Sequence, residues 1–274
     1  MTTLDGDKPR RPKRVIVLSY YETVNFGDRL GYHVLNSIMP AHADVTYANL
    51  NPWTVPDREY DLLILGIGNS LLPSDARDPK LAALMEQVPH SIGIFGTQVR
   101  SLFREGPAAD GLNRILNRLT TWWARYEEDI ALFGDGRSNV RHLGDWLIAA
   151  FPMAVPTVNR VLTIPADFLR ENVSLDRTIQ KIQAYRGVSS ARLHTLLCAL
   201  TSADHVSYQE QRVVPGSDEV TGKFGSMLID IFGRTYPEAE LFPVDREAVR
   251  RYKVKVAKNV EDLREELERL LAPQ

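Results

Sequence analysis

Short apolar runs alternate with amphipathic helix patterns along most of the chain, and this alternation constrains the fold more than any other feature. The first run, Val15–Tyr20, precedes a helix pattern marked by Leu30, Val34 and Ile38, which ends before Pro40. Further strand-like runs cover residues 45–48, 62–65, 91–95, 160–164 and 205–208. Strands that alternate with helices are typical of parallel sheets covered by helices. The sequence therefore predicts an α/β protein with Rossmann-like parallel sheets.

A proline-flanked break between Pro152 and Pro156 interrupts this alternation, which then starts again. The break predicts two parallel-sheet domains that face each other across a cleft. We expect a flexible tail over residues 1–13, a first domain over 14–152 and a shorter second domain over 153–274.

Composition excludes several classes of function. The chain has 274 residues and one cysteine, Cys198, so it has no intramolecular disulfide and no cysteine-based zinc site. A net charge of −2 argues against a general nucleic-acid binder, because such binding requires a strongly basic surface. No run approaches the roughly 18 apolar residues that span a bilayer, and the N-terminus lacks the apolar region of a secretion signal. We expect a cytoplasmic protein; a peripheral place at the inner face of the membrane stays open.

Residues 188–200 predict an apolar helix that carries a basic pair at its N-terminus. Ser189 or Ser190 is expected to cap this helix, so that Arg192 and His194 lie in its first turn. There the free backbone N–H groups and the helix dipole favour an anion. The segment therefore predicts a phosphate or carboxylate site. A surface arginine and a half-buried structural histidine would explain the same residues equally well.

Two glycine-containing turns follow predicted strands. In Asn25-Phe26-Gly27-Asp28, the aspartate is placed to cap the next helix and the glycine allows a close approach of backbone or ligand. In Gly66-Ile67-Gly68-Asn69, the two glycines begin a dinucleotide fingerprint, but Leu71 stands where the third glycine belongs. NAD binding is therefore not predicted. A helix cap and a turn glycine also explain both turns without any ligand.

Four segments, in this order, resemble the polysaccharide pyruvyl transferase family. They are Asn25-Phe26-Gly27-Asp28, Gly66-Ile67-Gly68-Asn69, Trp123-Ala124-Arg125-Tyr126-Glu127-Glu128 and Ser190-Ala191-Arg192-Leu193-His194. The first and last are the most specific, whereas the second departs from the family's usual glycine-rich run. The resemblance covers residues 15 to about 212, and the C-terminal half is short for the family.

The resemblance implies a glycosyltransferase-B-like fold, with the first domain on the acceptor side and the second on the donor side. It implies that phosphoenolpyruvate donates its pyruvyl group to a hydroxyl pair of a sugar or lipid-linked glycan, forming a cyclic ketal and releasing phosphate. The matching motifs imply donor binding by Arg125, Arg192 and His194, with Asn25 and Asp28 on the opposing face. The expected substrate-binding set is completed by Leu193, Gly27, Gly66, Gly68 and Asn69.

The expected chemistry fits these residue types. Two arginines can grip the carboxylate and the phosphate of phosphoenolpyruvate through paired hydrogen bonds. His194 titrates near neutrality in water, so it is the candidate acid for the methylene carbon or the partner of the leaving phosphate. Asp28 is the weaker candidate for the base that activates the hydroxyl. The expected site needs no metal and no further cofactor.

Two other functions stay open at this point. A nucleotide-sugar glycosyltransferase of the same two-domain shape would need a nucleobase pocket and a ribose-binding carboxylate, and the second half offers no clear candidate. A catalytically degenerate scaffold for glycan assembly would fit the short second half and the altered glycine run.

Overall fold

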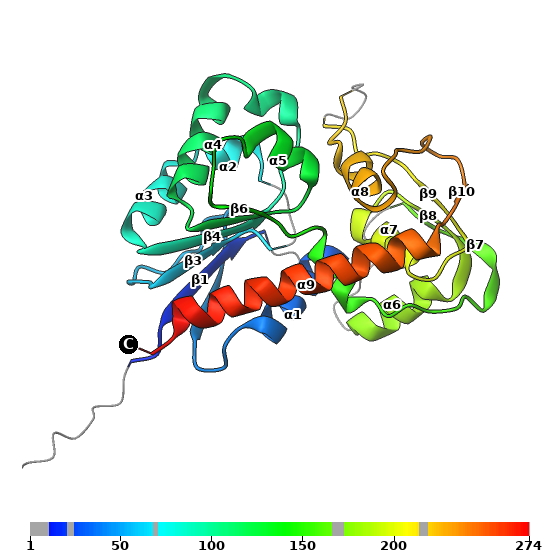
Figure 1. The fold of residues 1–274 in the computed structure, drawn as a ribbon, viewed down its shortest axis with the longest axis horizontal. Helices are drawn as coiled ribbons and strands as arrows, with labels where there is room; N and C mark the ends of the chain where they lie inside the picture. Colours follow the sequence, from blue (N-terminus) through cyan, green and yellow to red (C-terminus); the bar gives the residue numbers. More distant parts are fainter. Residues whose placement is uncertain (1–10, 21–24, 68–70, 166–172, 214–218, 274) are drawn as a thin grey trace, which may run out of the picture.

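The structure is a computed structural model that describes residues 11–20, 25–67, 71–165, 173–213 and 219–273. Its first sheet has six parallel strands in the order β2-β1-β3-β4-β5-β6. The strands are β1 Arg14–Ser19, β2 Asp44–Asn49, β3 Leu62–Leu65, β4 His90–Phe95, β5 Thr121–Ala124 and β6 Val140–His142. The expected parallel α/β fold is confirmed for this half of the chain (Figure 1).

The second sheet has four strands in the order β10-β9-β8-β7. The strands are β7 Val158–Ile164, β8 Tyr185–Ser190, β9 His205–Tyr208 and β10 Phe242–Pro243. Strands β7, β8 and β9 are parallel, whereas the short β10 pairs antiparallel with β9. The second sheet is therefore mixed. The expectation that both sheets are parallel is wrong for its edge strand β10.

Helices connect and cover the strands. The longer ones are α1 Phe26–Ile38, α3 Pro79–Gln87, α4 Gly106–Arg118, α6 Leu175–Gln183, α7 Leu193–Leu200, α8 Lys223–Phe232 and α9 Arg246–Leu271. The shorter ones are α2 Pro73–Ala76, α5 Glu127–Phe133 and the 3₁₀ turns η1 Arg100–Phe103 and η2 Trp146–Ala150. None of the helices in these described ranges is long and apolar enough to cross a membrane.

Two apolar clusters cover the two faces of the first sheet, as the alternation of side chains along a strand requires. Val15 and Val17 of β1 belong to one cluster, and Ile16 and Leu18 to the other. The first cluster continues through α1, α7, η2 and α9 into the second sheet. The two sheets therefore share one continuous core.

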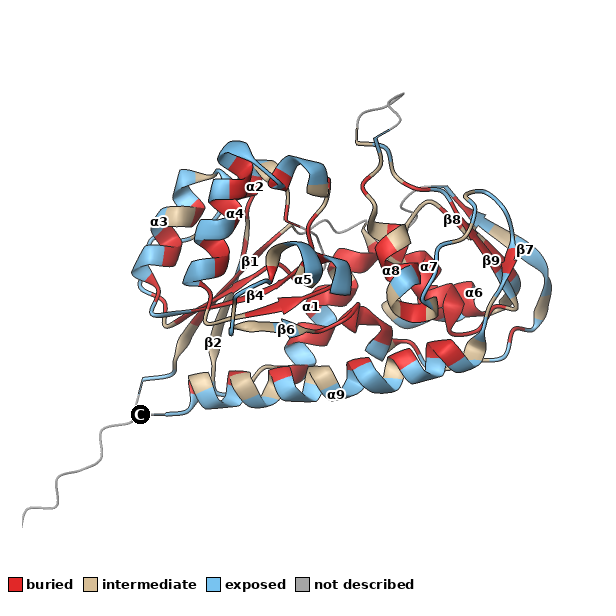
Figure 2. Ribbon diagram, turned by 45° about the horizontal axis from the view of Figure 1, so that its top comes forward, coloured by how far each residue is buried: buried red, intermediate tan, exposed pale blue. Residues whose placement is uncertain are grey.

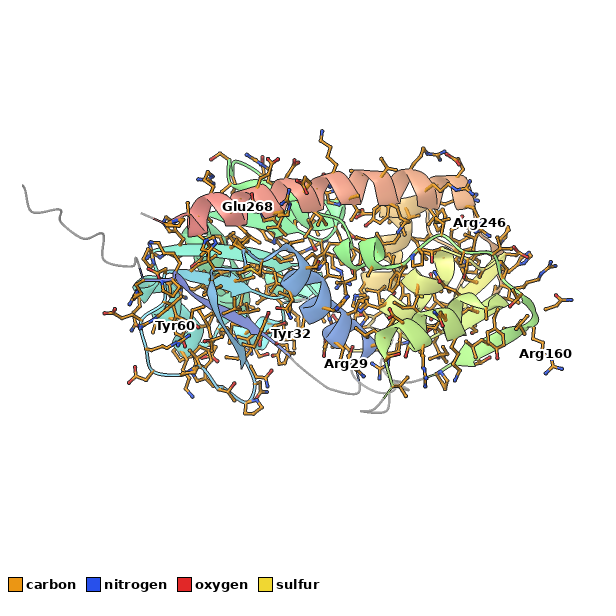
Figure 3. The ribbon with its side chains drawn as sticks, turned by 90° about the horizontal axis from the view of Figure 1, so that it is seen from below. Arg29, Tyr32, Tyr60, Arg160, Arg246 and Glu268 are labelled. Atoms are coloured by element: carbon orange, nitrogen blue, oxygen red, sulfur yellow. The ribbon has the colours of Figure 1, made fainter. Side chains whose placement is uncertain are left out.

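Helix α9 connects the two halves of the molecule. The sequence pattern predicts a final helix over residues 259–271, but α9 begins at Arg246 and has 26 residues. Figure 3 shows Arg246 beside the second sheet and Glu268 at the other end of the molecule. At that end His42 Nε2 lies 2.9 Å from the carbonyl oxygen of Leu271. Figure 2 shows that buried residues of α9 form a stripe facing the rest of the protein.

Candidate functional site

Arg125 and Asp145 form a buried ion pair at the carboxyl ends of neighbouring parallel strands. Arg125 follows β5 and Asp145 follows β6. The guanidinium donates from Nη2 and Nε to Asp145 Oδ2, at 2.6 and 3.2 Å. Burial alone would lower the pKa of Arg125, but the charge of Asp145, the hydrogen bond to it and the nearby tyrosines together outweigh burial, and the pKa is raised. This edge of an open parallel sheet is where such folds bind ligands.

His194 reaches this ion pair from the second sheet. It lies in the first turn of α7, which directly follows β8, and its Nε2 atom is hydrogen-bonded to Arg125 Nη2. The same nitrogen lies 3.8 Å from Asp145 Oδ1. The structure thus brings together Arg125 and His194, which are 69 positions apart in the sequence.

The contact with Arg125 fixes the tautomer of His194. A guanidinium has no acceptor, so Nε2 must accept and the imidazole proton lies on Nδ1. Burial lowers the pKa of His194 to about 3; Asp145 opposes this shift, and the positive charges of Arg125 and Lys223 add to it. The expectation that His194 titrates near neutrality is therefore wrong for the ligand-free protein, in which the ring is neutral.

Gly27 makes room for the imidazole. A Cβ atom at this position would overlap Nδ1 and Cε1 of His194. The first turn of α1 therefore packs directly on the ring, and α1 also packs on α7 itself. The close approach expected at Gly27 exists, and the group that approaches is a side chain of this protein.

Asp145 was not predicted as a site residue, yet it lies at the centre of the cluster. Its backbone N–H donates to Tyr252 Oη of α9 over 2.6 Å. Gly144, with φ of +82°, lets α9 come this close, because a Cβ there would lie 2.7 Å from Val256 and 2.9 Å from Tyr252 Oη. A Gly-Asp pair after a strand was the available signal, and it repeats the Gly27-Asp28 pair after β1.

Arg192 and Leu193 occupy different environments at the start of α7. Arg192 is the N-cap residue, with extended backbone angles, and its side chain is half-buried. Leu193 is 4% exposed and its side chain belongs to the core, where it cannot meet a ligand. The expected serine cap is wrong because Ser190 is the last residue of β8; its Oγ instead accepts from the Arg192 N–H at 2.9 Å.

At α1, the N-cap is Asn25 and the prediction that Asp28 caps the helix is wrong. Asn25 Oδ1 accepts from the Asp28 N–H at 3.1 Å, and Asp28 is buried in the first turn. Asn25 was expected to bind substrate, and here its side chain is engaged in the cap. The two residues share a helical turn with Gly27, which contacts His194.

Gly66 follows β3 with φ of +74°, and no contact between it and Arg125, Asp145 or His194 is found in the described residues. It lines a very small cavity, of about 10 Å³, together with Ser19, Tyr20 and Asp75. Tyr20 donates a hydrogen bond of 2.5 Å to Asp75 in this cavity. Gly68 and Asn69 lie outside the described residues. No group of three His, Cys, Asp or Glu side chains suited to a metal occurs in the described part of the chain.

Comparisons with known proteins leave the family open. No family model matches the chain, and no curated protein matches it by sequence. One similar solved structure is that of an uncharacterized protein from Klebsiella pneumoniae subsp. pneumoniae, at 12% identity and a TM-score of 0.48. The alignment covers 79% of this chain and 87% of that one. Nothing about function follows from this likeness.

Proposed function

We propose that this protein is a phosphoenolpyruvate-dependent pyruvyl transferase that forms a cyclic ketal on a sugar. The resemblance of the four segments suggests this activity, and one observation carries it. Arg125 from one sheet and His194 from the other are in direct contact, with Arg192 two residues before the histidine. Two guanidinium groups and the N-terminus of α7 suit a small donor that carries both a carboxylate and a phosphate.

The proposal places both substrates along the seam between the two sheets. The donor lies against α7, and the acceptor lies over the carboxyl ends of β1, β3 and β4. In this proposal the seam corresponds to the cleft that was expected from the sequence. We propose a cytoplasmic location for this enzyme.

Donor binding would change the protonation of His194. If an oxyanion of the donor accepts the hydrogen bond from Arg125 Nη2, the bond between Arg125 Nη2 and His194 Nε2 breaks. The negative charge of the donor then raises the pKa of His194, so that the ring gains a proton in the complex alone. His194 can then protonate the methylene carbon of the donor.

The protons of the reaction balance in this scheme. Two acceptor hydroxyl groups each lose one proton as they bond to the central carbon of the pyruvyl group. One proton is transferred to the methylene carbon, which becomes a methyl group, and the other leaves with phosphate as the ester bond breaks. Asp28, in the turn beside Gly27, stays the candidate base for the attacking hydroxyl.

The test is phosphate release from phosphoenolpyruvate over a panel of galactose- and mannose-containing acceptors, with the new methyl group detected by NMR. We expect His194→Gln to lower kcat by about 10²–10⁴-fold, the usual contribution of a positioned acid. His33→Gln, an exposed position on α1, is the matched control and should keep full activity. A fully active His194→Gln enzyme would exclude the acid role, and stabilisation by nucleotide sugars but not by phosphoenolpyruvate would favour a glycosyltransferase.

A further inference from the structure

A second arginine shares the aromatic ring that borders Arg125. Arg100 and Arg125 both lie against Tyr126, with their Cζ atoms 5.5 and 5.4 Å from the centre of the ring. Each guanidinium has its own buried carboxylate: Asp129 for Arg100, at 2.8 Å, and Asp145 for Arg125. The two ion pairs lie at the carboxyl ends of β4 and β5, next to each other in the sheet.

The donors of this second cluster are incompletely used. Arg100 Nε donates a hydrogen bond to Asp129 Oδ1, and Arg100 Nη1 lies 3.3 Å from Glu128 Oε2. Its Nη2 atom is buried and has no hydrogen-bond partner among the residues that the structure describes, and the same is true of Tyr126 Oη. The Arg100 side chain is 10% exposed and Tyr126 is fully buried. Most buried donors in proteins have an acceptor, so two unpaired donors side by side on one ring indicate a ligand site.

The backbone just before Arg100 is strained. Val99, the residue before it, adopts the left-handed conformation with φ 55° and ψ 56°, which is rare for a β-branched residue. Strain of this kind is typical of functional sites. Across the seam, a Cβ on Gly222 at the start of α8 would come within 3.2 Å of Arg100 Nη1. Arg100 therefore lies between the sheets, as Arg125 does.

We propose that Arg100 Nη2 and Tyr126 Oη form an anion subsite for the acceptor, which would then carry a carboxylate or a phosphate near its hydroxyl pair. This inference rests on the proposed pyruvyl transfer. In the proposed function the two charges of the donor are matched by Arg125, Arg192 and the N-terminus of α7, which leaves the Nη2 atom of Arg100 for another anion. Arg100 belongs to the first sheet, the proposed acceptor side. Guanidinium N–H and phenol O–H groups are both donors to an oxyanion.

The test measures binding by calorimetry and by the shift in Tm, using three probes: galactose 1-phosphate, a glucuronic acid–galactose disaccharide and neutral methyl galactoside. Arg100→Met/Asp129→Asn removes the guanidinium together with its buried counter-charge, so the fold does not retain an unpaired carboxylate. Tyr126→Phe removes the second donor. Arg104→Met, an exposed arginine just after η1, is the control for lost surface charge.

We expect the intact protein to bind one or both anionic probes at least about tenfold more tightly than methyl galactoside, the effect of a charge-assisted hydrogen bond. The double variant should lose this preference, Tyr126→Phe should weaken it several-fold, and Arg104→Met should keep it. Whichever anionic probe depends on Arg100 identifies the source of the anion. Equal binding of the charged and neutral probes, or a preference that survives in the double variant, would overturn the subsite.

A parallel titration with phosphoenolpyruvate separates this inference from the proposed function. A Tm shift with phosphoenolpyruvate that Arg192→Ala abolishes supports the donor site, whatever the sugar probes do. An Arg100-dependent preference without any effect of phosphoenolpyruvate would support the subsite and overturn the pyruvyl transfer. Failure of both titrations would overturn both.

Discussion

Gly27 and His194 depend on each other, because no other residue leaves space for the imidazole. Gly27→Ala should displace the ring and abolish activity, whereas in a His194→Ala background the same change should be neutral or stabilising, since alanine favours a helix by about 1 kcal/mol. We expect a coupling of about 1–3 kcal/mol between the two positions. Urea unfolding of the four proteins measures it, and additive effects would show that the ring does not pack on α1.

The lowered pKa of His194 makes stability depend on pH in a defined direction. The unfolded chain protonates this histidine below its ordinary value of about 6.5, and the folded protein does so near pH 3. Between these values the unfolded state binds more protons, so the contribution of His194 is full above pH 6.5 and is lost as the pH falls. We expect on the order of 2 kcal/mol lost at pH 5 relative to His194→Gln. Equal pH dependence of both proteins would contradict the buried, neutral ring.

At the residue scale, the sequence indicates which side chains matter better than it indicates what they do. Arg125 and His194 were both predicted, and they meet. Asp145 and Arg100 were missed because their ion-pair partners are distant in the chain. Their place at the carboxyl edge of the sheet also cannot be deduced from the periodicity of apolar residues. The acid role assumed an aqueous pKa for His194, and burial between two sheets cannot be deduced from a helix pattern.

At the scale of elements, the predicted strand runs match β1, β2, β3, β4, β7 and β9, whereas β5, β8 and β10 were not predicted. The ends of the helices were predicted poorly. Ser190 reads as a helix cap, but its backbone pairs with Ile164 on one side and Tyr208 on the other. Strand pairing with two neighbours outweighs one capping bond, so β8 extends and Arg192 becomes the cap. The first half of α9 was missed because its contacts are with segments distant in the sequence: Arg246 donates to the Ser202 carbonyl and Lys253 to the Ile148 carbonyl.

Two glycines with similar backbone angles test how α9 positions the site. Gly144 and Gly136 have φ of +82° and +70°, but only Gly144 would place a Cβ against α9; the space around Gly136 is open. Gly136→Ala should therefore cost about 1 kcal/mol, the backbone effect alone. Gly144→Ala should cost at least about 2 kcal/mol more and lower activity, because Tyr252 can no longer hold Asp145. Equal losses in chemical unfolding would show that the contact with α9 is not tight.

At the scale of the whole molecule, the shared core predicts that both sheets unfold together. Natural probes exist on each side: all four tryptophans precede β7, and the one cysteine, Cys198, is fully buried in α7. Tryptophan fluorescence and pulsed labelling of the Cys198 thiol should give the same urea midpoint. Two separate midpoints would show that the sheets are independent folding units, as the two-domain expectation in its strict form implies.

Helix α9 also restricts how substrates can enter. With 26 residues at about 1.5 Å each, it extends roughly 39 Å and is fixed near one end by Arg246, which donates to the Ser202 carbonyl at 3.0 Å, and near the other by Glu266, which accepts from Trp123 Nε1 at 2.7 Å. Because α9 is anchored at both ends and resists stretching, the two halves of the molecule cannot simply move apart. Rotation of one half about the axis of α9 would leave both anchors intact, so torsion is the relative motion that these two contacts permit.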